Sequence, residues 1–197
     1  YEMFFEDALT ASRELEITLT GKNCGQEEKA PMCGVPYHAV EGYLNKLVSK
    51  GYKVAICEQV EDPKQAKGIV KREVVRIVTP GTNLDTQALD ETKNNYIMCI
   101  VYIADRYGVS VADITTGDYF VTELPDGGKL KDEIYRFMPS EIICNESYYM
   151  SGMDLDDLKD RLGITIYSLD SWNFDDAVCR QKLLEHFKVA SFAGLGL

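Results

Sequence analysis

Long hydrophobic runs, histidines and closely spaced cysteines are scarce in this sequence of 197 residues. No apolar stretch approaches the roughly 20 residues that a membrane-spanning helix needs. The longest stretch, Tyr96 to Ala104, has the length of a strand. The N-terminus also lacks a basic region followed by an apolar segment, which is the pattern of a secretory signal. We therefore expect neither a membrane association nor secretion.

The six cysteines form no CxxC pair, and the chain has only two histidines. Zinc sites and redox motifs need closely spaced ligands, so we expect no metal site and no redox site. Cysteines scattered along a chain of this length are typical of reduced, mostly buried thiols, which favours the cytoplasm. The phosphate-binding patterns GxxxxGK[ST] and GxGxxG are absent, and the final GLGL is too short to hold a phosphate. No nucleotide site is expected in this chain.

Hydrophobic residues make up 45% of the chain, and its length fits one large domain or two small ones. The net charge of −11 argues against a free-standing nucleic-acid binder. The charge is uneven: residues 1–90 carry 11 basic and 14 acidic groups, whereas residues 91–197 carry 10 and 18. One stretch, 64–76, holds five basic residues against one acidic residue. A run of this kind is usually a solvated surface.

Helices and strands alternate in the first half of the chain. Apolar residues recur at helical spacing between Phe4 and Leu15 and again between Val40 and Val48, and Gly51 is placed to end the second helix. Asp62 and Pro63 have the residue types of a helix start. Strands are predicted at 17–20, 52–60 and 73–79, the second mostly buried, and a loop is predicted at 21–31.

The polar residues 83–95 lack periodicity, so we place a domain boundary there and predict domains at 1–90 and 91–197. In the second domain, three strand-like runs are joined by turns at 105–108 and 116–117. Helices and strands then alternate. This order predicts a mixed sheet with helices on its faces, and it is the element order of the RNase H-like fold. The predicted elements are strands at 96–104, 108–115 and 118–124, a helix at 130–137, a strand at 141–144, a helix at 155–162, a strand at 164–169 and a helix at 177–187.

The RNase H-like order raises the possibility of a metal-dependent nuclease. Two-metal hydrolysis needs converging carboxylates, one of them in the middle of the first strand. That strand, YIMCIVYIA, contains no acid, and Asp105, Asp113 and Asp118 fall at turns or strand ends. His38, just before the second helix, has no readable nucleophile as a partner, so a helix-start or packing role is the simpler interpretation. The sequence therefore predicts no catalytic residue.

Four segments resemble one family: YEMFFEDA, PMCGVPYHAVEGYLNKLVSKGYKVAICEQVEDP, KGIVKREVVRIVTPGT and DITTGDYFVTEL. In this order they resemble the N-terminal part of the MutS family of bacterial DNA mismatch repair proteins. The resemblance covers most of the chain, is most specific at 31–82 and is weakest at 145–175. It implies a mixed-sheet α/β mismatch-recognition domain (1–90) followed by an RNase H-like connector domain (91–197).

The resemblance implies a mismatch-binding role for Tyr1 and Glu2. They match the second and third residues of the family's Phe-Tyr-Glu motif, so the wedge phenylalanine of that motif would precede Tyr1. Glu2 would accept a hydrogen bond from a displaced base, and its charge would penalise intact DNA. The alternative is an ordinary exposed acid near a helix start.

Further DNA contacts are expected from two segments that carry the resemblance. The basic stretch gains a second interpretation, since Lys64, Lys67, Lys71, Arg72 and Arg76 would contact phosphates near a kink. Arg76 is the best of these, because it lies in VVRIVTPGT, which resembles the family. The alternation of a strand there also turns Arg76 away from Val75 and Ile77. The PMCGVPYH loop adds three candidates at the border of the groove: Met32, Tyr37 and His38.

The remaining expectations concern partners and cofactors. The resemblance implies that this chain is not itself an enzyme, and that ATP and Mg²⁺ belong to domains beyond Leu197 in a full-length homodimer. The expected partners are double-stranded DNA with a mismatch or small loop and, through the connector, a MutL-like protein. The acidic balance of the second domain fits a connector that does not hold DNA. Two alternatives stay open, a protein-interaction module without DNA recognition and an RNase H-like metal-dependent nuclease.

Overall fold

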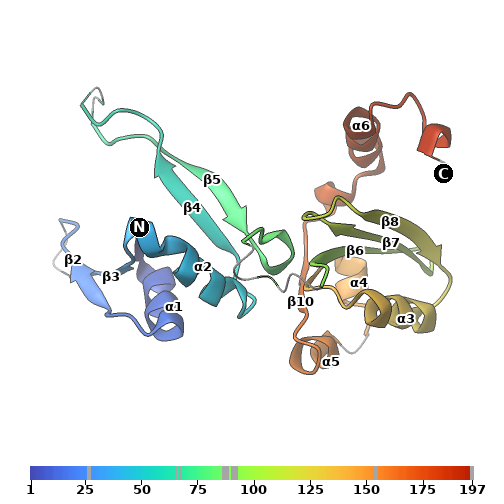
Figure 1. Ribbon diagram of the computed structural model, residues 1–197, viewed down its shortest axis with the longest axis horizontal. Helices are drawn as coiled ribbons and strands as arrows, with labels where there is room; N and C mark the ends of the chain where they lie inside the picture. Colours follow the sequence, from blue (N-terminus) through green and yellow to red (C-terminus); the bar gives the residue numbers. More distant parts are fainter. Residues whose placement is uncertain are drawn as a thin grey trace. The chain divides into compact units, whose positions relative to one another are not determined.

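The computed structural model describes residues 1–25, 28–64, 66, 68–85, 89, 93–152 and 155–195. The chain divides into two compact units, Tyr1–Asn94 and Asn95–Leu197 (Figure 1). The predicted boundary between residues 90 and 91 lies outside the described residues. Both units combine helices with β-sheets, which confirms the predicted α/β class. No helix in the described part of the chain is long and apolar enough to cross a membrane.

The first unit contains two small antiparallel sheets and two helices. Strands β1, β3 and β2 form one sheet in that order, and β4 pairs with β5 in a separate two-stranded ribbon (Figure 1). The mixed sheet expected for the first domain is therefore corrected to antiparallel sheets in the described residues, because β5 folds back on β4 as a hairpin does. The elements are β1 (Glu2–Phe4), α1 (Phe5–Leu15), β2 (Thr20–Lys22), β3 (Ala30–Gly34), α2 (Val40–Val48), β4 (Val54–Gln59) and β5 (Arg72–Val78), with 3₁₀ turns at Tyr37–Ala39 and Pro80–Thr82.

The helices predicted from the apolar spacing at 4–15 and 40–48 are both confirmed. Ala8, Ala11 and Leu15 lie on one face of α1 and are buried against Cys33 of β3 and Leu47 of α2. The small alanines let α1 approach the sheet closely, and the burial of this stripe stabilises a short helix more than propensity does. After α2, Gly51 adopts a φ of 86°, which is the left-handed conformation that its position predicts.

Two predictions for residues 17–31 are wrong. Residues 17–19 lie outside the strands, and β2 begins only at Thr20, opposite Met32. The first residues of the predicted loop 21–31 belong to β2 and its last residues belong to β3. Gly21 accordingly pairs with Pro31. Glycine and proline are poor strand formers, but the pairing is set by contacts with β1 and α1, which no local pattern contains.

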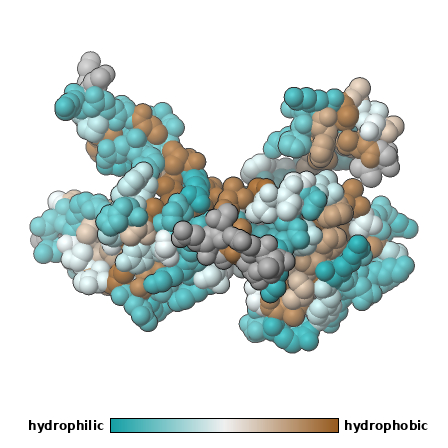
Figure 2. Space-filling model, in the orientation of Figure 1, coloured by the Kyte–Doolittle hydropathy of each residue, from teal (hydrophilic) through white to brown (hydrophobic). Residues whose placement is uncertain are grey.

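The ribbon also differs from its prediction. β4 is not mostly buried: Ala55, Cys57 and Gln59 are exposed, because only the opposite face packs on α2. Among the residues described between Asp62 and β5, none is helical. The Asp62 carboxylate instead accepts a hydrogen bond from the Lys64 amide at 2.9 Å and closes a turn. Figure 2 shows apolar side chains exposed along the ribbon among hydrophilic ones; they include Val74, Val75 and Ile77.

The second unit is built on the predicted mixed sheet. The strand order is β10-β9-β6-β7-β8, with β6, β7 and β8 antiparallel and β9 and β10 parallel to β6 (Figure 1). This arrangement confirms the RNase H-like fold predicted for the second domain. Its elements are β6 (Tyr96–Ile103), β7 (Arg106–Asp113), β8 (Tyr119–Leu124), α3 (Gly127–Phe137), β9 (Glu141–Cys144), α4 (Glu146–Tyr149), α5 (Leu155–Asp160), β10 (Thr165–Ser168) and α6 (Asp176–Phe187), with 3₁₀ turns at Ser171–Phe174 and Phe192–Leu195.

The core of the second unit lies between one sheet face and the helices α3, α4 and α5, which bury Ile134, Tyr148 and Leu158. The short helix α4 is absent from the prediction, because four residues are too few for a periodic pattern. Helix α6 contacts the other face of the sheet. Two consecutive residues of β8 face the helices on opposite sides of the sheet. The ring of Tyr119 lies 6.0 Å from that of Phe187 of α6, and the ring of Phe120 lies 5.4 Å from that of Phe137 of α3.

All six cysteines are free, as predicted. The prediction that they are mostly buried is wrong, because only Cys33 and Cys144 are buried and Cys24 and Cys57 are exposed. Burial raises the pKa of Cys144 to about 11, so this thiol stays protonated at neutral pH.

Candidate nucleic-acid interface

Tyr1 is anchored by contacts with three residues, Val35, Tyr37 and Glu58. Its amino group donates to the Val35 carbonyl and its carbonyl accepts from the Val35 amide, both at 2.9 Å. Its ring stacks on Tyr37 at 5.7 Å, and its hydroxyl donates to the carboxylate of Glu58 on β4. This hydrogen bond to an anion raises the pKa of Tyr1 to about 12. Tyr1 therefore fixes the position of the start of β1.

Glu2 lies on the face of the three-stranded sheet that points away from α1. Met3 and its register partner Cys33 face the helix, so Glu2 and Phe4 face the other way. Phe4 is paired with Met32, which places Met32 on the same face. We call this surface the outer sheet face and define it by four residues: Glu2, Phe4, Lys22 and Met32.

Lys22 is the ion-pair partner of Glu2. Its ammonium lies 2.7 Å from the Glu2 carboxylate and 5.3 Å from the centre of the Phe4 ring. The sequence alone did not single out Lys22 as a site residue. The pairing depends on the register that sets β1 and β2 on either side of β3, which is not readable from spacing.

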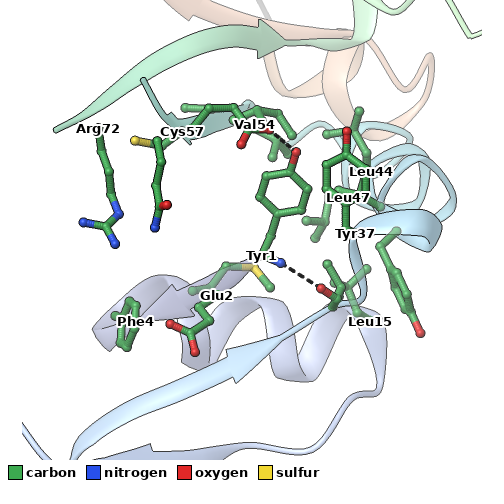
Figure 3. Close-up of a pocket in the computed structure, with 18 residues that line it drawn as sticks. Tyr1, Glu2, Phe4, Leu15, Tyr37, Leu44, Leu47, Val54, Cys57 and Arg72 are labelled. Carbon is green, nitrogen blue, oxygen red and sulfur yellow. Dashed lines mark hydrogen bonds between the residues drawn. The ribbon is translucent and has the colours of Figure 1, made fainter. Parts of the chain in front are cut away.

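Four of the predicted site residues meet at one cavity of about 470 Å³: Tyr1, Glu2, Tyr37 and Arg72. Apolar side chains of α2 and β4 form much of its wall, among them Leu44, Leu47 and Val54. Figure 3 shows the Tyr1 ring standing in the cavity with its hydroxyl directed at β4, while Arg72 points from the ribbon toward the side where Glu2 and Phe4 lie. The other four candidates, all in the described part of the chain, lie outside this lining: Met32, His38, Lys71 and Arg76.

The basic candidates of the ribbon differ in their partners. Lys71 pairs with Glu73 at 2.5 Å, and Arg72 donates to the Val70 carbonyl at 3.1 Å. Ile69, which precedes both residues along the chain, is 91% exposed. Lys64 is exposed in the turn that Asp62 closes, and Lys67 lies outside the described residues. This part of the chain thus carries both basic residues and an exposed apolar side chain.

Arg76 lies on the opposite side of β5 from Ile77, as the alternation predicts. Its guanidinium pairs with Glu41 of α2 at 2.9 Å, so Arg76 joins the ribbon to the helix. The side chains of Arg76 and Glu41 are 41% and 50% exposed to solvent. Another anion can therefore reach Arg76 and take the place of Glu41. A phosphate contact of Arg76 would replace Glu41.

The loop candidates occupy the 3₁₀ turn before α2 and the outer sheet face. Tyr37 is 74% exposed despite its stacking on Tyr1, and His38 is exposed beside it. The position of His38 agrees with a helix-start residue. Met32 is half-buried on the outer sheet face.

The three acids weighed for a nuclease site, Asp105, Asp113 and Asp118, take part in local hydrogen bonds. Asp113 is buried and accepts from the backbone amides of Asn95 and Thr115 at 3.1 and 2.8 Å. Asp105 accepts from the Tyr102 hydroxyl and Asp118 from the Thr116 hydroxyl. In the described part of the chain, no group of three or more His, Cys, Asp or Glu side chains is arranged to hold a metal ion.

Comparison with known families identifies both units. The model of MutS domain I matches residues 1–87, and that of MutS domain II matches residues 95–197. The two units are therefore the first two domains of a mismatch-repair type of protein, which is the class that the fold and the candidate interface define.

Individual relatives support the same assignment. The chain is 64% identical over 197 residues to the DNA mismatch repair protein MutS of Lachnoclostridium phytofermentans, with 100% of this chain and 21% of the relative covered. It is 49% identical over 205 residues to that of Alkaliphilus metalliredigens, covering 100% and 23% of the two chains. Against that of Acetivibrio thermocellus it is 53% identical over 191 residues, covering 95% and 22%. The chain belongs to the MutS family, and it spans about a fifth of the length of these relatives.

Proposed function

We propose that the first domain recognises mispaired or unpaired bases in double-stranded DNA, as part of a longer mismatch repair protein. The observation that carries this proposal is the position of Glu2, which lies on the outer sheet face and lines the same cavity as Arg72 of the basic ribbon. A carboxylate beside a cationic strand is a poor surface for phosphates alone. It suits a site that reads a base edge while cations nearby hold the backbone.

The proposed mechanism is a test of how easily the duplex deforms. Inserting an aromatic side chain unstacks a base step at a cost of a few kcal/mol, and stacking returns about 1–3 kcal/mol per base. A mismatch has already lost pairing and stacking, so the same kink costs less there. By resemblance, the wedge would be the phenylalanine that stands before Tyr-Glu in the family's motif. The anchoring of Tyr1 to Val35, Tyr37 and Glu58 would hold that wedge rigidly.

Each site residue has a proposed role in this mechanism. Glu2 accepts a hydrogen bond from the displaced base and repels intact DNA, where no base edge is free to compensate. The cations Lys71, Arg72 and Arg76 contact phosphates and position the duplex without reading sequence. The remaining candidates border the groove: Met32, Tyr37 and His38.

The second domain is proposed to connect recognition to the rest of the protein. Its excess of acidic groups fits a domain that does not hold DNA. Its edge strand exposes Tyr119, Phe120 and Val121, which favours a protein contact, and a MutL-like protein is the proposed partner. ATP and Mg²⁺ would bind outside this chain, which has no phosphate loop, and the full-length protein would act as a cytoplasmic homodimer.

The test is a comparison of matched and mismatched duplexes with the full-length protein at low salt. Fluorescence anisotropy should give tighter binding to a single mismatch or a one-nucleotide loop, and energy transfer between labelled DNA ends should report a bend. Equal affinity for both duplexes without bending would contradict the proposal. Retained binding of a MutL-like protein in that case would favour the interaction module, whereas DNA cleavage on titration with Mg²⁺ or Mn²⁺ would favour the nuclease.

A further inference from the structure

Lys22 spans the central strand of the sheet to reach Glu2. It lies on β2 and Glu2 lies on β1, with β3 between them. On β3, Glu2 is opposite Gly34 and Lys22 is opposite Ala30, so the lysine side chain reaches Glu2 diagonally across this strand. The ammonium lies 2.7 Å from the carboxylate and is held over Phe4 at 5.3 Å. The long lysine side chain is thus positioned by both an anion and an aromatic ring.

We propose that Lys22 is a specificity-determining residue. It masks the charge of Glu2 and thereby sets how strongly the first domain rejects fully paired DNA. This inference rests on the proposed role of Glu2 in the same site.

The masking has different consequences in the two complexes. On a matched duplex the bases are paired with each other, so Lys22 is the cation that compensates Glu2 beside the phosphates. On a mismatched duplex the displaced base donates a hydrogen bond to Glu2 and supplies part of that compensation. Removing Lys22 therefore leaves Glu2 poorly compensated on the matched duplex and better compensated on the mismatched one, since an anion without a partner is costly.

The size of this effect follows from the exposure of the pair. The side chains of Lys22 and Glu2 are 47% and 49% exposed, so their interaction is that of a surface ion pair. Loss of Lys22 should therefore raise the preference for mismatched over matched DNA by about two- to fivefold. The loss of a cation should at the same time weaken binding to both duplexes and reduce its salt dependence.

The test is a double-mutant cycle in the full-length protein, with Lys22→Gln, Glu2→Gln and the double variant. Anisotropy titrations with one matched and one mismatched duplex give the affinity ratio for each protein. With Glu2 present, Lys22→Gln should raise the ratio about two- to fivefold. With Glu2→Gln already in place, Lys22→Gln should leave the ratio unchanged, because no charge remains to be masked.

Three further variants control for other effects. Lys46→Gln removes a cation of the same domain that lies over Tyr43 on α2, and it should leave the ratio unchanged. Lys22→Arg keeps the cation and should keep the ratio. Lys22→Thr replaces Lys22→Gln if the glutamine variant folds poorly, because threonine is favoured in strands. It also removes the cation, so the same rise in the ratio is expected.

A ratio that stays constant or falls in Lys22→Gln overturns the inference, and so does an equal rise in both backgrounds. The single variant Glu2→Gln separates this failure from that of the proposed function. If Glu2→Gln narrows the preference while Lys22→Gln does not change it, only the role of Lys22 is refuted. If Glu2→Gln has no effect on the preference, the proposed role of Glu2 is refuted as well.

Discussion

The hydroxyl of Tyr1 donates a hydrogen bond to the carboxylate of Glu58, which joins the residue just before β1 to β4 across the cavity. The bond needs the protonated phenol, and it raises the pKa of Tyr1 from 10.0 to about 12. The start of the first domain is thereby attached to the basic ribbon, whose proposed role is to hold the phosphates.

This link predicts a pH dependence of stability. A group whose pKa is raised by folding contributes stability below its unfolded pKa and loses it as pH rises through the folded value. The wild type should therefore be more stable than Tyr1→Phe up to about pH 10, and the difference should disappear between pH 10 and 12. Urea denaturation across this range tests it. Tyr37→Phe keeps the stacked ring and should behave as wild type, and a difference that does not change with pH would contradict the role of the hydroxyl.

Gly34 and Gly42 should respond to alanine with opposite signs. A Cβ at Gly34 would lie 3.0 Å from the Tyr1 carbonyl oxygen, a backbone atom that cannot move without shifting β1. Gly34→Ala should lower the free energy of unfolding by about 1–3 kcal/mol and weaken mismatch preference. A Cβ at Gly42, inside α2, meets nothing within 4 Å, so Gly42→Ala should add about 0.5–1 kcal/mol. Urea titration of both variants measures these changes in the free energy of unfolding. A Gly34→Ala protein with wild-type stability and wild-type preference for mismatched DNA would show that β1 tolerates displacement.

Arg76 should contribute to the salt dependence of DNA binding if it exchanges Glu41 for a phosphate. Arg76→Gln would then reduce the slope of log affinity against log salt by about one unit, equally for matched and mismatched duplexes. Arg13→Gln is the matched control and should leave the slope unchanged. Arg13 is also ion-paired, with Glu14 at 3.1 Å, but it lies on α1. An unchanged slope for Arg76→Gln would mean that Arg76 only joins the ribbon to α2.

A substitution in the core of the second domain should lower its stability without changing the preference for mismatched DNA. Ile134 is fully buried, so Ile134→Ala should cost about 2–5 kcal/mol of unfolding free energy. Ile103 in the same domain is 63% exposed, and Ile103→Ala should change stability by less than about 0.5 kcal/mol. Below the melting transition, both variants should retain the wild-type preference for mismatched DNA. A lost preference in folded Ile134→Ala would assign part of the recognition to the connector.

The elements of the connector were largely predictable from its sequence, because local patterns dominate there. The strand Glu141–Cys144 is found at the predicted residues, and the alternation of short apolar runs gave the mixed sheet. The three-stranded sheet of the first domain was not predictable in this way. Its strands have only three to five residues, too few for a period, and their pairing is fixed by contacts with α1.

The candidate site shows the same division. The resemblance pointed to Glu2, and the strand alternation gave the direction of Arg76. Their partners were out of reach, since Lys22 lies 20 residues from Glu2 along the chain and Glu41 lies 35 residues from Arg76. Such pairs depend on register and on helix placement, which only the folded chain defines.

The most direct measurement is the effect of Glu2→Ala on the affinities of the full-length protein for matched and mismatched DNA at one salt concentration. If Glu2 rejects intact duplex, the variant should bind fully paired DNA more tightly than wild type does, and its preference for the mismatch should narrow. An unchanged ratio of the two affinities would contradict the role of Glu2 and, with it, the proposed mechanism of discrimination.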